Sequence, residues 1–449
     1  MSTTTAVCRT PLAAELAAAR SRTDFLFRIL RPEALYARPI GERHRMIFYV
    51  GHLEAFDWNM ICRRGLDRES FHPEFDRLFE FGIDPAEGSL PTDTESDWPS
   101  VDEVRSYNRR VRAQLDTAIE HAPEQIVRAA IEHRWMHAET LAYLLHNLPY
   151  KHKTSPGTDG PAETWTKTSP GADGPAENGI RGIGDAPSGD SGGRIGSTCV
   201  PVECPPIPSD PALIEIPAGE ATLGQRREEF GWDNEFDEHL RRVPAFAIGK
   251  YKVTNADYLR FVEAGAEPPF FWTGQAGAWF YRGMFRLFPL PGDWPVYVTY
   301  EEAQAYARWR GAELPTEAEF HRAAYGTPEG AERPYPWGHQ APSADRGNFD
   351  FAQWDPLAVT ANPAGDSAWG VSQLLGNGWE WTSTPFAPFA GFRAFDFYPR
   401  YSAAFFDDDH FVMKGGSPQT AQCLLRRSFR NWFRRRYPYV YGTFRLVQR

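Results

Sequence analysis

The sequence is short of cysteine, and the few cysteines follow no recognisable pattern. They lack the spacing of a disulfide framework or of a CxxC metal motif, and an odd number of them fits a reducing compartment. No apolar run approaches the length that spans a bilayer, and residues 1–22 lack the apolar core and cleavage site of a signal peptide. We therefore expect a soluble, cytoplasmic protein with no membrane partner. The five cysteines are Cys8, Cys62, Cys199, Cys204 and Cys423.

Positive charge is also in deficit. The chain has 48 Lys and Arg against 59 Asp and Glu, and this net charge of -11 argues against a general binder of nucleic acid or of anionic membranes. One basic stretch, residues 426–436, carries arginines interleaved with aromatic residues. We interpret these arginines as partners in internal ion pairs and in carboxylate binding, and we expect no nucleic-acid partner.

The chain of 449 residues is longer than one hydrophobic core usually supports, so we expect two domains. Within residues 1–150, apolar positions recur at three- and four-residue spacing in four segments, which predicts four helices joined in an up-and-down bundle. The interior of such a bundle is a common place for a metal site built from facing helices. The predicted helices cover residues 11–30, 46–64, 101–121 and 123–148.

Residues 151–206 differ abruptly in composition from what precedes them. They are rich in Gly, Pro, Ser, Thr and Asp, and a 14-residue unit that begins at Lys153 repeats from Lys167. Such a segment buries too little apolar surface to offset the entropy of ordering it. We therefore predict a disordered linker without a function of its own.

Residues 207–449 are dense in aromatic residues, Gly and Pro. The pattern predicts short strands, with helices at 255–264 and 300–310. Thr316 and Glu319 have the spacing of a capping box for a further short helix. The expected fold class is therefore α+β, with a four-helix bundle followed by an irregular mixed domain.

Three histidines are the strongest functional signal. His133 and His137 lie one helical turn apart in an HxxxHxE pattern, so both imidazoles point the same way, and His52 lies in a second predicted helix. Three neutral imidazoles that converge from two helices would hold a divalent metal and leave coordination positions for oxygen and substrate. Iron and zinc both suit three histidines, and the pattern alone leaves the choice open.

Each neighbouring group also has a simpler interpretation. Taken alone, His52 would more often be a hydrogen-bonded helix histidine than a ligand. His146 is nine residues from His137, more than two turns away, so we interpret it as a core or surface residue. Glu139 is two residues from His137 and faces away from it on a helix.

A series of short motifs follows in order along the C-terminal residues: IPAG at 216–219, KVTN at 252–255, LPTEAE at 314–319, PWG at 336–338, GNGWEW at 376–381, KGGS at 414–417 and GTFR at 442–445. With these motifs, the C-terminal residues resemble the formylglycine-generating-enzyme fold, which is related to C-type lectins. The resemblance implies the fold more firmly than the activity, because the cysteine pair that those enzymes use is absent from residues 427–433.

A DinB-like bundle with three histidines fused to this fold resembles the ergothioneine-type sulfoxide synthases, nonheme iron enzymes that use O2 and act on hercynine, the trimethylated betaine of histidine. The resemblance implies that His52, His133 and His137 bind Fe(II). The face of an indole such as Trp432 suits a quaternary ammonium, which cannot donate a hydrogen bond. The substrate-binding residues expected on this basis are Asn431, Trp432, Phe433, Phe386, Phe389, Met136 and Arg430.

Two departures from that family concern the second substrate. The stretch 82–97, where members that use a carboxylate-bearing thiol carry arginines, has five acids and no arginine. The family's tyrosine proton donor after the GNGWEW motif is also replaced here, since residues 384–392 contain no tyrosine and offer Phe386 and Phe389 in its place.

These departures resemble the selenoneine synthase branch. They imply carbon–selenium bond formation between hercynine and a neutral selenosugar donor. Two alternatives remain: an ergothioneine sulfoxide synthase with a thiol donor, and a lectin-like ligand-binding protein with a structural zinc.

Overall fold

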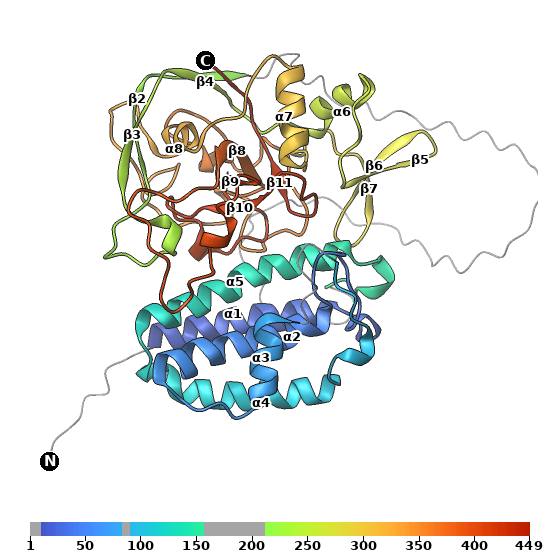
Figure 1. Ribbon diagram of the computed structural model, residues 1–449. Coiled ribbons are helices and arrows are strands. Elements are labelled where there is room, and N and C mark those ends of the chain that lie inside the picture. Colours follow the sequence, from blue (N-terminus) through green and yellow to red (C-terminus); the bar gives the residue numbers. More distant parts are fainter. Residues whose placement is uncertain (1–9, 83–89, 157–211) are drawn as a thin grey trace, which may run out of the picture. The chain divides into compact units, whose positions relative to one another are not determined.

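The computed structural model describes residues 10–82, 90–156 and 212–449 (Figure 1). Most of the predicted linker lies outside these ranges, including nearly all of both copies of its repeat. Within the described ranges, no helix is long and apolar enough to cross a membrane.

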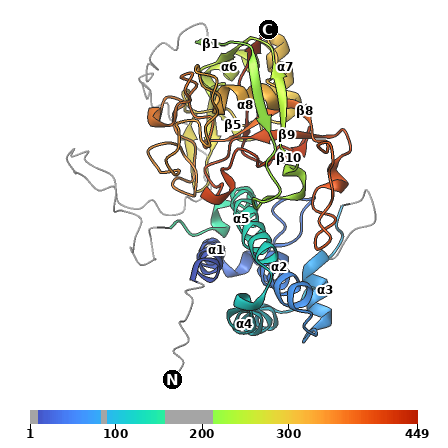
Figure 2. The same ribbon diagram turned by 90° about the vertical axis from the view of Figure 1, so that its left-hand side faces the viewer.

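The N-terminal part is a helical bundle, as predicted, but with one helix more than expected. Four long helices begin and end within a few residues of the predicted bounds, and the second continues as a π-helix, Trp58–Arg64. The additional helix is α3, a nine-residue helix capped by the His72 side chain. Figure 2 shows α1 beside α5 and α3 beside α2. The helices are α1 Thr10–Ile29, α2 Met46–Asp57, α3 Pro73–Phe81, α4 Val101–Ala118 and α5 Glu124–Asn147.

Helix α2 is the central helix of this bundle. Every residue of it except Val50 is buried. It packs against α3, α4 and α5, so a side chain on α2 can face a different helix on each side. This is the reason why a histidine in the middle of α2 lies in the protein interior.

The C-terminal part contains several small sheets and three helices, which confirms the α+β class. Its main sheet has the strand order β10-β9-β8-β11. The strands of that sheet are β8 Trp379–Pro385, β9 His410–Lys414, β10 Asn431–Arg434 and β11 Gly442–Thr443. The other strands are β1 Leu213–Ile216, β2 Gly219–Leu223, β3 His239–Val243, β4 Phe246–Gly249, β5 Trp272–Gln275, β6 Ala278–Arg282, β7 Leu287–Pro289 and β12 Val447–Gln448. The helices are α6 Asn255–Glu263, α7 Tyr300–Trp309 and α8 Glu317–Tyr325.

The sequence motifs of this part hold the fold together. The Lys252 ammonium donates to the carbonyls of Gly376 and Gly378 at 3.0 and 2.6 Å, and Arg445 pairs with Glu380, both fully buried. The predicted capping box also forms: the backbone N–H of Glu319 donates to the Thr316 hydroxyl, and that of Thr316 to the Glu319 carboxylate. These motifs therefore specify the architecture and leave the chemistry to other residues.

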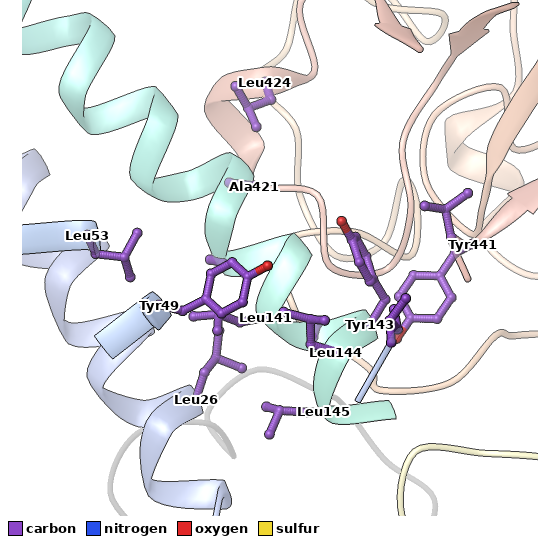
Figure 3. Packing of buried hydrophobic residues seen from close by; sticks show 14 of the residues in the cluster. Leu26, Tyr49, Leu53, Leu141, Tyr143, Leu144, Leu145, Ala421, Leu424 and Tyr441 are labelled. Carbon is purple, nitrogen blue, oxygen red and sulfur yellow. The ribbon is translucent and has the colours of Figure 1, made fainter. Parts of the chain in front are cut away.

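One hydrophobic core runs from the bundle into the C-terminal part. Leu26, Tyr49 and Leu141 belong to the same cluster of buried residues as Leu424 and Tyr441 (Figure 3). Helix α5 supplies many of the contacts between the two parts. Polar contacts reinforce it: the Nδ1 atom of His146, on α5, lies 3.1 Å from the Tyr441 hydroxyl, as expected for a core histidine.

Candidate metal centre and substrate cavity

The three predicted histidines converge. His52 comes from α2 and His133 and His137 from α5, and one ring nitrogen of each lies within 4.8 Å of the others. The Nε2 atoms of His52 and His137 are 3.3 Å apart. All three side chains come from helices, so the backbone fixes the position from which each imidazole side chain extends.

Neighbouring groups fix the orientation of the rings. The Nδ1 atom of His52 lies 2.6 Å from the carbonyl oxygen of Phe79 on α3, so Nδ1 carries the proton and Nε2 presents its lone pair to the centre. The His133 ring stacks on Phe56 with centroids 3.4 Å apart. Hydrogen bonding and stacking of this kind hold imidazoles ready for a metal.

The electrostatics also fit a metal. Burial lowers the pKa of His52 to about 4, and burial together with the neighbouring histidines lowers the pKa of His133 and His137 well below the ordinary value. All three rings are therefore neutral at pH 7. The Nε2 atoms of His52 and His137 face each other with no carboxylate between them among the described residues, which leaves their lone pairs available to a cation. The three residues fit a divalent metal.

Gly51 is required by the packing around His52. A Cβ atom there would lie 2.4 Å from the ring of Phe79, the residue whose carbonyl orients His52. We expect Gly51→Ala to push α3 away, to cost about 1–3 kcal/mol of stability, and to weaken metal binding. Thermal denaturation and metal titration measure both effects. Gly41→Ala is the matched control, because nothing lies within 4 Å of its added Cβ. Equal behaviour of the two variants would contradict the prediction.

Buried neutral histidines also predict how the metal-free protein responds to pH. Burial lowers the pKa of His52 to about 4 and that of His146 to about 3, against about 6.5 in the unfolded chain. Below pH 6.5 the unfolded chain therefore binds more protons than the folded one, and stability falls as the pH falls. We expect a loss of up to about 1.4 kcal/mol per pH unit for each such histidine. Urea denaturation at pH 7.5 and 5 measures it, and equal midpoints would argue against it.

A cavity of about 830 Å³ opens beside the histidines. His133 and His137 form part of its wall. The remaining wall combines aromatic with polar and charged side chains and comes from α5, the turn before α2, Leu90 and Pro91, and the C-terminal part. Four of the predicted substrate-binding residues are in this wall: Met136, Asn431, Trp432 and Phe433.

Four aromatic residues of the wall form what we call the aromatic cage: Tyr398, Tyr401, Phe405 and Trp432. The Trp432 ring lies 5.4 Å from that of Tyr401 and 5.7 Å from that of Phe405, and Tyr398 is 6.3 Å from His133. Several aromatic faces around one space suit a quaternary ammonium group.

Phe386, Phe389 and Arg430 lie elsewhere, in contrast to the prediction that they contact substrate. None of the three is among the described residues that line the cavity. Phe386 stacks on Trp432 at 4.2 Å, and the Arg430 guanidinium lies over the ring of Phe389 and pairs with Glu317 at 3.1 Å. These residues lie behind the cage wall.

Tyr398 and Tyr401 were missed, because the sequence interpretation stopped at Phe392. Burial raises the pKa of Tyr398 to about 12 and that of Tyr401 well above its ordinary value. Both hydroxyls are therefore protonated at neutral pH and can donate hydrogen bonds. The cavity thus has tyrosine hydroxyls, although Phe386 and Phe389 stand where one was expected.

Some acids of the stretch 82–97 bond to groups nearby in the protein. Asp93 pairs with Arg38 and with Arg45, the latter at 3.0 Å. Asp97 accepts a hydrogen bond from the backbone of Thr94 at 2.6 Å. Two of the five acids are thus used locally, and residues 83–89 lie outside the described ranges. Local use of these acids weakens the sequence argument for a neutral donor.

Two glutamates that flank the histidines on α5 bind the C-terminal part. Glu139 faces away from His137, as predicted, and accepts hydrogen bonds from Trp379 at 2.7 Å and from Ser417 at 2.6 Å. Glu132 accepts from Arg426 at 2.6 Å, and Arg426 also contacts Glu235. The basic stretch is therefore used in internal ion pairs, as the sequence indicated.

Comparison with known proteins agrees with this two-part organisation. Residues 15–147 match the DinB superfamily, and residues 202–449 match the sulfatase-modifying factor enzyme 1-like domain. The chain is 33% identical to hercynine oxygenase of Mycolicibacterium smegmatis over 95% of this chain and 96% of that protein. It is 42% identical to hercynine oxygenase of Mycolicibacterium thermoresistibile over 46% of this chain and 51% of that one. It is 27% identical to ergothioneine biosynthesis protein 1 of Schizosaccharomyces pombe over 94% of this chain and 54% of that one.

Proposed function

This chain belongs to the ergothioneine-type sulfoxide synthase family, and on that basis we propose that it joins hercynine to a chalcogen donor in an iron- and oxygen-dependent reaction. It is an oxygen-dependent enzyme, so the alternative of a lectin-like binding protein is set aside.

The observation that carries the proposal is three neutral histidines beside an aromatic cage in one cavity. His52, His133 and His137 would hold Fe(II), which when bound supplies the redox chemistry with oxygen. The cage receives the trimethylammonium group of hercynine against Trp432. The Asn431 amide, which also lines the cavity, can donate a hydrogen bond to the carboxylate on the same carbon.

The protein's part in the reaction is to hold two substrates together. Cage contacts fix the betaine end of hercynine, so its imidazole carbon is presented toward the histidines. The protonated hydroxyls of Tyr398 and Tyr401 stand close to this end, the latter 3.4 Å from the sulfur of Met136.

We propose a selenosugar as the donor. Supporting features are the absence of arginine from residues 82–97 and the phenylalanines at 386 and 389. One observation favours the second candidate, a carboxylate-bearing thiol: the cavity wall contains Arg43, which has no acidic partner among the described residues. With a thiol, one O2 oxidises the hercynine C–H and the S–H to a C–S bond, leaving one oxygen on sulfur and one in water. A selenol would balance in the same way.

Product analysis tests the proposal. Protein reconstituted anaerobically with iron(II) receives hercynine, oxygen and either a selenosugar or cysteine, and mass spectrometry identifies the products. A hercynine–selenium adduct from the sugar, with little product from cysteine, is the expected result. Product formed only with cysteine would show that the donor is a thiol and not a selenosugar. No consumption of hercynine with either donor overturns the proposal, and zinc-loaded protein is the inactive control.

A further inference from the structure

Arg43 is a cavity residue that the function described so far does not use. It lies in the turn before α2, and its Nε atom donates to the hydroxyl of Tyr437 at 2.8 Å. Its guanidinium lies over the rings of Tyr437 and Tyr143, 5.3 and 5.9 Å from their centroids. In the described part of the chain, no carboxylate pairs with it and its two terminal nitrogens make no hydrogen bond.

This environment is unusual for an arginine. The neighbouring arginines Arg38 and Arg45 both pair with Asp93, whereas Arg43 is surrounded by aromatic rings. Glu42 also lines the cavity but forms no ion pair with Arg43 among the described contacts. A partly buried guanidinium that keeps its fork of donors free toward a cavity is poised to bind oxygen atoms of a ligand.

Arg43 and the aromatic cage belong to different ends of the cavity. Along α5, the cage contacts the helix at Met136, through the Tyr401 hydroxyl, and Arg43 contacts it at Tyr143. These positions are seven residues apart, a rise of about 10 Å. His137 lies between them on the helix.

One hercynine molecule cannot place its charged groups at both the aromatic cage and Arg43. Its trimethylammonium and carboxylate groups are attached to the same carbon atom, so a cage that holds the first keeps the second close by. A group at Arg43 must therefore belong to the other substrate. That substrate has to place its chalcogen near the histidines and its oxygen-bearing part toward Tyr143.

We propose that Arg43, positioned by Tyr437, binds the oxygen-bearing part of the chalcogen donor and determines which donor the enzyme accepts. This deepens the proposed function and rests on it. The chemistry shared by the two candidate donors is a set of hydrogen-bond-accepting oxygens, as carboxylate or as sugar hydroxyls. Tyr143 and Tyr437 also line the cavity and give this end an apolar edge beside the guanidinium.

Binding without turnover tests this. Anaerobic iron(II)-loaded protein is titrated by calorimetry with hercynine and, separately, with two thiol donors, 1-thio-β-D-glucose and cysteine. The two donors share a thiol and differ in the group that carries it. We expect Arg43→Met to weaken binding of one thiol donor by about 10- to 100-fold, the effect of losing a hydrogen bond to a charged group, and to leave hercynine binding within about twofold. Tyr437→Phe, which removes only the hydroxyl that positions Arg43, should weaken it by about threefold.

Trp432→Ala is the reverse control, and it should weaken hercynine binding while sparing the donors. Which of the two donors responds to Arg43→Met distinguishes sugar hydroxyls from a carboxylate. The proposal is overturned if Arg43→Met weakens hercynine instead, weakens every ligand equally, or changes none. Arg43→Lys, which keeps the charge but loses the fork, guards against a folding defect and should show an intermediate loss. Failure of the proposed function is distinguishable from failure of this inference, because it would appear as the absence of product in the reaction with oxygen.

Discussion

His137→Ala is expected to lose the metal and the activity together. The Nε2 atom of His137 lies 3.3 Å from that of His52 in the centre of the cluster, and no carboxylate or cysteine stands by as a substitute among the described ligand groups. Losing even an outer-shell partner of a metal ligand costs about 10- to 100-fold in affinity or activity, so losing a ligand should exceed 100-fold. Iron content after desalting and the rate of hercynine consumption measure the effect.

A second histidine of the same helix is the control for this prediction. His146 is also buried on α5, but its ring nitrogens contact the Tyr441 hydroxyl and the Arg282 carbonyl. His146→Ala should lower stability and leave the iron content unchanged. If His137→Ala retained iron at the level of the unmodified protein, the three-histidine site would be wrong.

Arg134→Met is expected to cause the largest loss of stability. Arg134, next to His133 on α5, is fully buried and donates to Asp57 at 2.6 Å and Glu54 at 3.2 Å, both buried on α2. Burial raises the pKa of Asp57, and the surrounding arginines hold that of Glu54 at about 2 against the effect of burial. Removing the guanidinium leaves the Asp57 carboxylate unpaired in the interior, whereas Glu54 keeps its ion pair with Arg112 at 2.6 Å, and the loss should cost about 3–5 kcal/mol.

An exposed ion pair on the same helix gives the comparison. Arg128 pairs with Glu124 one turn earlier at the surface, so Arg128→Met should change stability by less than about 0.5 kcal/mol. Urea denaturation of both variants at pH 7 measures the difference. Similar midpoints for the two would show that the buried network contributes little. Because Arg134 joins α2 to α5, its loss should also weaken metal binding by His52 and His133.

The metal site could be predicted from the sequence because its residues follow helical periodicity. His133 and His137 are one turn apart on a long amphipathic helix, so their common direction follows from geometry. The same reasoning could have located α3: Pro73 starts it and Phe75 and Phe79 lie four residues apart on its buried face. This helix was not predicted because it has only nine residues and lies between two helices with clearer patterns.

The substrate cavity was harder to predict because irregular backbone has no period. Asn431, Trp432 and Phe433 all line the cavity although they are consecutive in β10, so the alternation of an ideal strand does not say which side chains face it. Tyr398 and Tyr401 come from a loop whose course only the packed protein specifies. Arg43 carries no local signal either, because whether an arginine has an acidic partner depends on residues distant in sequence.

The two glutamates on α5 have a consequence for exchanging domains between relatives. Glu132 and Glu139 lie seven residues apart, on either side of His133 and His137, and each bonds to the C-terminal part through buried groups. A chimaeric enzyme that takes its bundle from one relative and its C-terminal part from another must bring a matching arginine and tryptophan for Glu132 and a matching hydroxyl pair for Glu139. Otherwise two carboxylates remain unpaired at the junction, and the shared cavity is lost even though each half keeps its own fold.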